Sequence, residues 1–429
     1  MFSKLEKITN YKICEGIDFS HIKTQKFKNA SIAVAFFVPL DKNSVSGFAT
    51  LISILSDSCK KFQNFKSLNR YIEEIYGASL GYDISKIGNY QVLELYISAL
   101  DDKFTANKDK NTEKIADLLC ELIFNPLIIE NEFDKNFDKN IVLKRKKEII
   151  ELIENQISDK RTWSMIRCNQ IMFENQKCGI SKYGTKDDIN NLDEKKLFEF
   201  YNKLIKNSRI KIFFISNSEC QDIINKFKNY FLKINRKINF NFEKINNIKS
   251  QKIKEITEKM KVEQCKLVMG FKTPFVKPDT YNILLASAIL GGTPASKLFI
   301  NVREKMHLCY YCSSMFDSST GALYISSGVE ESNCEKAKNE ILNQIKLMQN
   351  GQINNNEISE AKNILVQNLK SVSDKISSLY EWYLGQYIFG LQESPEDYIS
   401  KILKVSKQDI INCMLKISLD TVYILKGGK

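Results

Sequence analysis

The sequence predicts an α+β protein made of two homologous α/β domains that are related by internal duplication. The chain has 429 residues, enough for two to four domains, and 43% of them are apolar, so each domain can bury a core. Strand and helix patterns recur in the same order in both halves. Small details recur at an offset of about 230 residues: Glu74 matches Glu304, and Tyr96-Ile97-Ser98 matches Tyr324-Ile325-Ser326.

The first half begins with an alternating apolar segment, which is typical of a strand, followed by two stretches with helical spacing. A later helix should stop at Pro126, because proline disfavours helix in the residue before it. The predicted elements are strand 30–40, helix 47–57, helix 67–77, strand 89–100, helix 112–126, helix 140–160 and strand 210–216.

The second half repeats this order. Its first helix ends in two glycines, and its last has Gly351 just past its end. The predicted elements are strand 266–275, helix 281–292, helix 296–308, strand 321–329 and helix 334–350.

A polar, basic and weakly periodic segment separates the halves and predicts a linker. The predicted domains are therefore 1–232 and 263–429, joined by residues 233–262.

Composition excludes several classes of protein. The longest apolar run, near Ile32 to Leu40, is too short to cross a bilayer. No apolar stretch follows the first lysines as in an export signal, and the eleven cysteines lack a disulfide framework, so we expect a cytoplasmic protein with reduced thiols. The formal charge of +12 comes from lysines spread along the chain among acidic residues, which indicates a solvated surface and not a nucleic-acid site.

Histidine is scarce. His21 and His307 are the two histidines in the sequence, so clustered imidazole ligands for a catalytic zinc ion are not available within this chain. His21 lies in a polar stretch and is expected at the surface.

The order of elements, together with LGGTPASKLFINVREKMHLCYY, resembles the pitrilysin/insulinase and mitochondrial-processing-peptidase family of zinc metallopeptidases. The most specific matches are Gly291 to Phe299 and Arg303 to Tyr310. The resemblance covers nearly the whole chain and implies the fold of this family, two domains of the LuxS/processing-peptidase-like type. Within the family, the chain looks most similar to bacterial members without catalytic function that are associated with the 5-aminopentanone modification of elongation factor P.

The family signature is an inverted zinc motif, His-x-x-Glu-His, on the first helix. Two histidines four residues apart share one helix face, and the glutamate takes a proton from the zinc-bound water. Here Thr50, Ser53 and Ile54 stand at the motif positions. None of them can replace these groups, so we expect no metal in this chain.

A downstream glutamate supplies the third zinc ligand in the family. Glu151 is the best match, with Glu148 and Glu154 as alternatives in register. Without two histidines beside it, such a glutamate is more simply explained as a solvated helix residue.

Arg303 and Tyr310 are retained. In relatives, the corresponding arginine and tyrosine reach the catalytic site of the other half and bind the peptide, and both can donate hydrogen bonds to a developing oxyanion. Without the resemblance, Arg303 would be interpreted as a surface cation and Tyr310 as a half-buried aromatic residue of a strand. Gly291 and Gly292 are expected at a helix end in left-handed backbone, and the resemblance also places them near a bound peptide; their spacing to Lys297 does not fit a phosphate loop.

His307, Cys309 and Cys312 form one further cluster. If this segment enters a strand, Cys309 and Cys312 should point to opposite faces, and both could not bind one metal ion.

Two functions remain open. The leading prediction is a subunit, inactive on its own, that forms a peptide chamber with a zinc-bearing homologue and contributes Arg303, Tyr310, Gly291 and Gly292 to peptide binding; zinc is expected only in the partner. The alternative is a homodimeric clamshell that binds peptides without cleaving them. Neither involves nucleic acid or a membrane.

Overall fold

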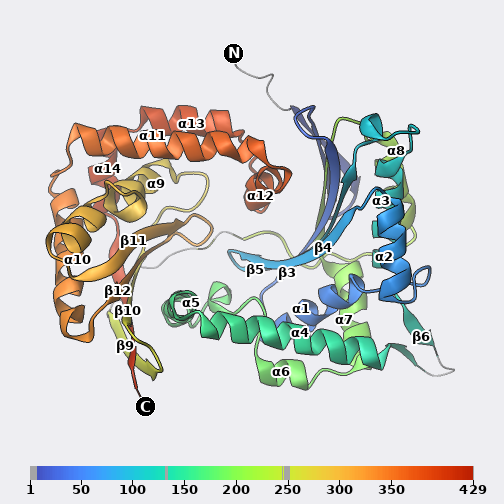
Figure 1. The fold of residues 1–429 in the computed structure, drawn as a ribbon, viewed down its shortest axis with the longest axis horizontal. Coiled ribbons are helices and arrows are strands. Elements are labelled where there is room, and N and C mark those ends of the chain that lie inside the picture. Colours follow the sequence, from blue (N-terminus) through green and yellow to red (C-terminus); the bar gives the residue numbers. More distant parts are fainter. Residues whose placement is uncertain (1–6, 131–133, 244, 246–251, 429) are drawn as a thin grey trace. The chain divides into compact units, whose positions relative to one another are not determined.

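The structure, a computed structural model, describes residues 7–130, 134–243, 245 and 252–428. These residues form two units, each with its own sheet and helices (Figure 1). Unit 1 contains the described residues up to Ile153 together with Ile180–Asn241, and unit 2 contains Glu154–Gly179 and the described residues from Phe242 onward.

Unit 1 contains a six-stranded sheet with the order β1-β2-β8-β3-β5-β4. β2 and β8 run parallel, and the other neighbouring strands pair antiparallel. Most residues of β3, β5 and β8 are buried, as expected for central strands. The strand bounds are β1 Lys7–Cys14, β2 Ile17–Lys23, β3 Asn29–Pro39, β4 Ser79–Ile87, β5 Tyr90–Leu100 and β8 Arg209–Ser216, with a separate hairpin of β6 Ile128–Glu130 and β7 Lys135–Phe137.

The helices of unit 1 pack on this sheet: α1 contacts β4 and β5, α3 contacts β3 and β5, and α7 contacts β3. Helix α3 ends two residues before Pro126, as predicted. The bounds are α1 Val45–Leu55, α2 Phe65–Glu74, η1 Asp102–Phe104, α3 Asn111–Phe124, α4 Lys139–Ser158, α6 Lys186–Asn190, α7 Glu194–Asn207 and α8 Gln221–Phe231. The last residues of α4 belong to unit 2.

The five-stranded sheet of unit 2 repeats the topology of unit 1. Its order β11-β12-β10-β13-β9 corresponds to β4-β5-β3-β8-β2, and each pair of neighbours has the same relative direction as its counterpart. The bounds are β9 Lys254–Met260, β10 Cys265–Lys272, β11 Cys309–Asp317, β12 Ala322–Val329 and β13 Ser418–Gly427. This repeat agrees with the predicted internal duplication.

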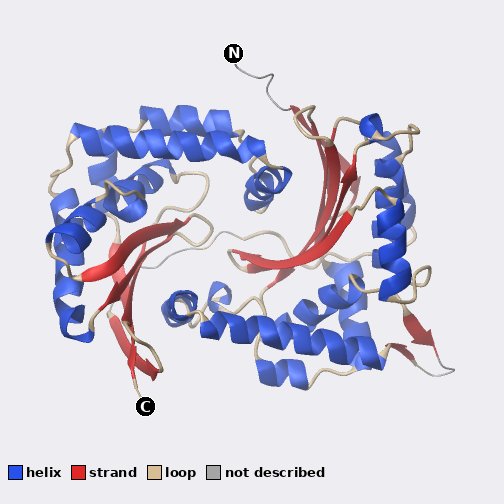
Figure 2. Ribbon diagram, viewed as in Figure 1, coloured by secondary structure: helices blue, strands red, loops and turns tan. Residues whose placement is uncertain are grey.

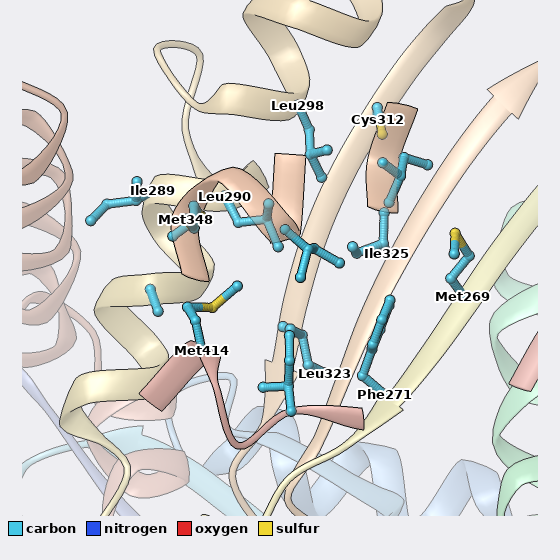
Figure 3. Packing of buried hydrophobic residues seen from close by; sticks show 14 of the residues in the cluster. Met269, Phe271, Ile289, Leu290, Leu298, Cys312, Leu323, Ile325, Met348 and Met414 are labelled. Carbon is cyan, nitrogen blue, oxygen red and sulfur yellow. The ribbon is translucent and has the colours of Figure 1, made fainter. Parts of the chain in front are cut away.

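Helices cover both faces of the unit 2 sheet (Figure 2). On one face, Met269, Phe271, Leu323 and Ile325 pack with buried residues of the helical segments, as Figure 3 shows. The other face packs against α5. The bounds are α5 Lys160–Met172, η2 Lys177–Gly179, α9 Tyr281–Ser287, η3 Ala288–Gly292, η4 Leu298–Lys305, η5 Glu331–Asn333, α10 Cys334–Gln349, α11 Asn355–Ser371, η6 Val372–Asp374, α12 Ile376–Tyr387, α13 Pro395–Lys404 and α14 Lys407–Met414.

Two predicted helices of the second half differ in type from an α-helix. The helix predicted at 281–292 changes from α to π geometry at Ala288, and the one predicted at 296–308 is the π-helix η4. Hydrophobic spacing detects a helix but does not distinguish these types.

The segment predicted as a linker contains strand β9, and residues 160–172 of the predicted first domain form α5, which packs in unit 2. None of the described helices is long and apolar enough to span a membrane.

Candidate functional site

Helix α1 carries Thr50, Ser53 and Ile54, which were predicted to stand at the motif positions, and all three side chains are buried. Its sequence, VSGFATLISIL, contains no charged residue, and every residue of the helix is buried. Thr50 and Ser53 are 0% exposed and Ile54 is 4% exposed. The Thr50 hydroxyl donates to the Ser46 carbonyl at 2.9 Å, and the Ser53 hydroxyl donates to the Thr50 carbonyl at 2.7 Å. The two hydroxyl groups are therefore satisfied within their own helix, and the three side chains do not fit a zinc ion.

Hydrogen bonds fix the start of α1 from neighbouring segments. The Gln91 amide nitrogen donates to the carbonyl oxygens of Val45 and Lys182, at 3.0 and 2.8 Å. The Thr185 backbone N–H donates to the Ser46 hydroxyl at 3.3 Å. These bonds position the first turn of the helix.

The histidines do not supply a metal site either. His21 is buried and stacks on Phe214, with ring centroids 5.1 Å apart, so the prediction of a surface histidine was wrong. His21 lies on β2 beside the central strand β8, and its burial lowers the pKa of the imidazole. His307 is exposed. Within the described part of the chain, no three His, Cys, Asp or Glu side chains are grouped to hold a metal ion.

Helix α4 carries the three candidate glutamates, and the structure favours Glu148 as the inward-facing one. Glu151 and Glu154 are exposed, and the Glu151 carboxylate lies 3.9 Å from the Lys147 ammonium group. Glu148 is half-buried and accepts hydrogen bonds from the Tyr82 hydroxyl and, at 2.6 Å, from Arg145. Burial and the Glu148 carboxylate raise the pKa of Tyr82, so this phenol remains a donor.

Arg145 joins this glutamate to the end of α1. Its guanidinium donates to Asp57 at 2.6 Å, and the Lys144 ammonium group lies 2.8 Å from the same carboxylate. Burial opposes the charge of Arg145, but the carboxylates of Glu148 and Asp57 outweigh it and raise the pKa of Arg145. An ion-pair network thus connects α4 to the end of α1. Arg145, Asp57 and Tyr82 were not predicted from the sequence, in which the three-residue spacing of Arg145 and Glu148 on one helix is the signal for this contact.

Arg303 lies on the π-helix η4 with its side chain 41% exposed. Its guanidinium carbon lies 4.5 Å from the centre of the Phe299 ring, and its Nε lies 3.4 Å from a carboxylate oxygen of Glu304. Both partners belong to the same helix. The guanidinium is therefore oriented locally while its charge stays accessible.

Tyr310 is exposed at the beginning of β11, where the strand contains a bulge. Cys309 pairs with Val329 and Tyr311 pairs with Gly328, so Tyr310 is the extra residue and has no partner in the ladder. The Tyr310 residue is 56% exposed. A bulge re-aims a side chain, and here it leaves the phenol free of the core.

Gly291 and Gly292 end the π-helical segment η3, and neither has a positive φ. The prediction of left-handed backbone was therefore wrong. A Cβ atom on Gly291 would lie 2.6 Å from the Ser314 backbone nitrogen, so this glycine permits close packing of η3 on β11. Gly292 is exposed, and the nearest atom to its Cβ position is 3.4 Å away.

Cys309 and Cys312 lie on the same face of β11, contrary to the prediction of opposite faces. The bulge shifts the register so that they pair with Val329 and Ser327, which lie on one face of β12. Cys312 belongs to the core cluster of Figure 3, and Cys309 packs against that cluster. A regular strand alternates its faces, and the extra residue cancels the alternation.

The chain is similar to known proteins of one kind. Residues 191–365 match the model described as the peptidase M16 inactive domain. Over 96% of this chain and 96% of the relative, the sequence is 29% identical to a Bacillus subtilis protein described as probable inactive metalloprotease YmfF. It is 24% identical to an uncharacterized zinc protease of Rickettsia bellii, over 70% of this chain and 71% of that protein.

The fold also has a counterpart among solved structures. The crystal structure of a conserved protein from Enterococcus faecalis superposes with a TM-score of 0.90, covers 98% of this chain and 99% of that chain, and is 24% identical in sequence. This similarity confirms the predicted fold class.

Proposed function

We propose that this chain, an inactive homologue of the M16 metallopeptidases, is the non-catalytic subunit of a two-chain zinc peptidase. The family model and the Bacillus relative are both described as inactive, which supports the prediction that the chain is not an enzyme on its own. The proposal adds a zinc-bearing homologue as partner and a peptide as substrate.

The main support for this proposal is that the Arg303 and Tyr310 side chains are exposed and can reach a peptide. A guanidinium and a phenol are the hydrogen-bond donors needed to hold a peptide carbonyl and to stabilise the oxyanion that develops on it. The π-helix and the bulge present them to solvent, and both features are frequent at functional sites. In contrast, the side chains at the motif positions of α1 are buried.

In this proposal the two chains have different roles. The partner binds zinc and breaks the peptide bond, while this chain binds and orients the peptide through Arg303 and Tyr310. Gly291 contributes indirectly, because it permits the close packing of η3 on β11. A cytoplasmic location and the association with elongation factor P modification stay predictions.

The test is co-purification with a zinc-bearing homologue encoded in the same genome, followed by peptide hydrolysis with wild type, Arg303→Ala and Tyr310→Ala. We expect kcat to fall by about 10²-fold for each, the scale of losing one oxyanion donor. Lys305→Ala, which removes an exposed cation of the same helix, serves as the matched control. Wild-type turnover in both variants would remove the assigned role.

The same experiment addresses the homodimeric clamshell. Under that alternative, the chain would self-associate, bind peptides and ignore the zinc-bearing homologue. Sedimentation of the chain alone and mixed with the homologue distinguishes the two assemblies.

A further inference from the structure

Unit 2 contains a cavity of about 300 Å³ that is lined by residues of helices α9, α11, α12 and α13, which Figure 1 labels. Its walls are mainly apolar, and Leu284, Leu369 and Trp382 line it while they stay only partly buried. An engineered apolar cavity of about 150 Å³ already binds benzene. The cavity of unit 2 therefore has the volume of a small-molecule site, and its apolar side chains are left partly uncovered by the described residues.

The polar groups on one wall of this cavity are bonded to each other. The Trp382 indole N–H and the Gln386 amide nitrogen both donate to the Glu393 carbonyl oxygen, at 2.8 and 3.0 Å. The Glu393 carboxylate accepts hydrogen bonds from the Tyr281 hydroxyl, at 2.7 Å, and from the Lys401 ammonium group. This wall is therefore held in place by the protein itself, and the charge of Glu393 is already paired.

Lys277 lines the same cavity from the loop between β10 and α9, and its charge is not paired in this way. Its ammonium group donates to the Gly385 carbonyl oxygen at 3.0 Å. Among the residues that the structure describes, none offers a carboxylate within ion-pair distance of this group. An ammonium group has three donors, so Lys277 can still donate to a ligand in the cavity.

The surroundings of Lys277 do not remove its charge at neutral pH. Burial lowers the pKa of the ammonium group to about 8, and the carboxylates of Asp317 and Glu393 oppose this effect from a longer distance. At pH 7 the protonated form still predominates. A partly desolvated cation without an ion-pair partner gains more from a bound anion than a solvated surface lysine does.

We propose that this cavity binds a medium-chain aliphatic carboxylic acid, with the carboxylate on the Lys277 ammonium group and the chain against the apolar side chains of α9, α11 and α12. Lys277 supplies charge-assisted hydrogen bonds, and the leucines supply the apolar contact. A neutral or cationic ligand of the same shape would leave the lysine charge unpaired. The proposal concerns a site within unit 2 and does not depend on the proposed peptidase partner.

Isothermal titration calorimetry of the full chain at pH 7, with octanoate and with 1-octanol as probes, tests the proposal. Wild type should bind one octanoate per chain. Lys277→Met keeps an unbranched side chain of similar length without the charge, so it should weaken octanoate by about 10- to 100-fold and leave the affinity for 1-octanol unchanged. Leu369→Trp narrows the cavity from α11 and should weaken both probes.

Lys404→Met removes an exposed cation of α13 and is the matched control, which should bind both probes as wild type does. Thermal melts of each variant check folding, and Leu369→Trp gives an independent answer if Lys277→Met does not fold. Absence of octanoate binding to wild type would overturn the proposal. So would an equal octanoate affinity of wild type and folded Lys277→Met, or of wild type and folded Leu369→Trp.

Discussion

The Arg145 guanidinium lies 2.6 Å from the Asp57 carboxylate, and this ion pair joins helix α4 to the end of α1. Both side chains are nearly buried, with 10% and 6% exposed. Removing the cation leaves two carboxylates, Asp57 and Glu148, without their shared partner. We expect Arg145→Ala to lower the free energy of unfolding by about 3 kcal/mol.

Urea denaturation measures this loss, and Lys147→Ala on the same helix is the control. The Lys147 ammonium group pairs with Glu151 at 3.9 Å on an exposed face, so its removal should change stability by less than about 0.5 kcal/mol. Equal effects of the two substitutions would contradict a structural role for the buried pair.

Metal content is the second prediction. Because Thr50, Ser53 and Ile54 offer no zinc ligands, the purified chain should contain far less than one zinc ion per molecule. Elemental analysis checks the content, and a chelator should leave the melting temperature unchanged. A stoichiometric zinc ion whose removal lowers the melting temperature would contradict the description of α1.

The paired glycines give the third prediction. Gly291→Ala would place a Cβ atom 2.6 Å from the Ser314 nitrogen, so η3 must move away from β11. We expect a loss of about 1–3 kcal/mol in unfolding free energy, the usual cost of overpacking. Gly292→Ala, at an exposed position with its nearest neighbour 3.4 Å away, should cost clearly less. Thermal melts of the two variants measure these losses, and an equal loss in both would contradict the packing role of Gly291.

The fourth prediction concerns Arg303 and Tyr310. Both are substantially exposed, so Arg303→Ala and Tyr310→Ala should change stability by less than about 0.5 kcal/mol. Chemical denaturation of each variant checks this. A large loss of stability would mean that any effect on peptide turnover reports folding and not peptide binding.

The fifth prediction is a pH profile for Cys309. Its pKa of about 7 lies below that of an ordinary thiol, so the thiolate forms as the pH rises through 7. The rate of iodoacetamide alkylation at Cys309 should therefore rise between pH 6 and 8 and level off above, on the scale set by that pKa. Cys334, with a pKa raised to about 11, should react slowly throughout this range. Identical profiles at the two sites would contradict the assigned environment.

The lowered pKa of Cys309 also makes the stability of the folded chain depend on pH. A thiol with a lower pKa in the folded state contributes stability above its unfolded pKa of about 8.5 and loses it as the pH falls through 7. Cys309→Ser should flatten this part of the stability profile, which denaturation at several pH values measures.

The sequence by itself determined the α+β class and the repeated order of elements. Hydrophobic periodicity is a local property, and residue identity alone shows that Thr50, Ser53 and Ile54 are not a metal site. The tertiary structure decided which side chains meet. It buried His21 against Phe214, joined Arg145 to Asp57, and gave Gly291 a packing role.

Only the folded chain also placed Cys309 and Cys312 on the same face of β11. One extra residue in a strand inverts the side-chain alternation beyond it, and the position of that residue depends on how β11 pairs with β12. Local sequence therefore specifies elements and their composition, while contacts between elements set the geometry and the pKa values on which chemistry depends.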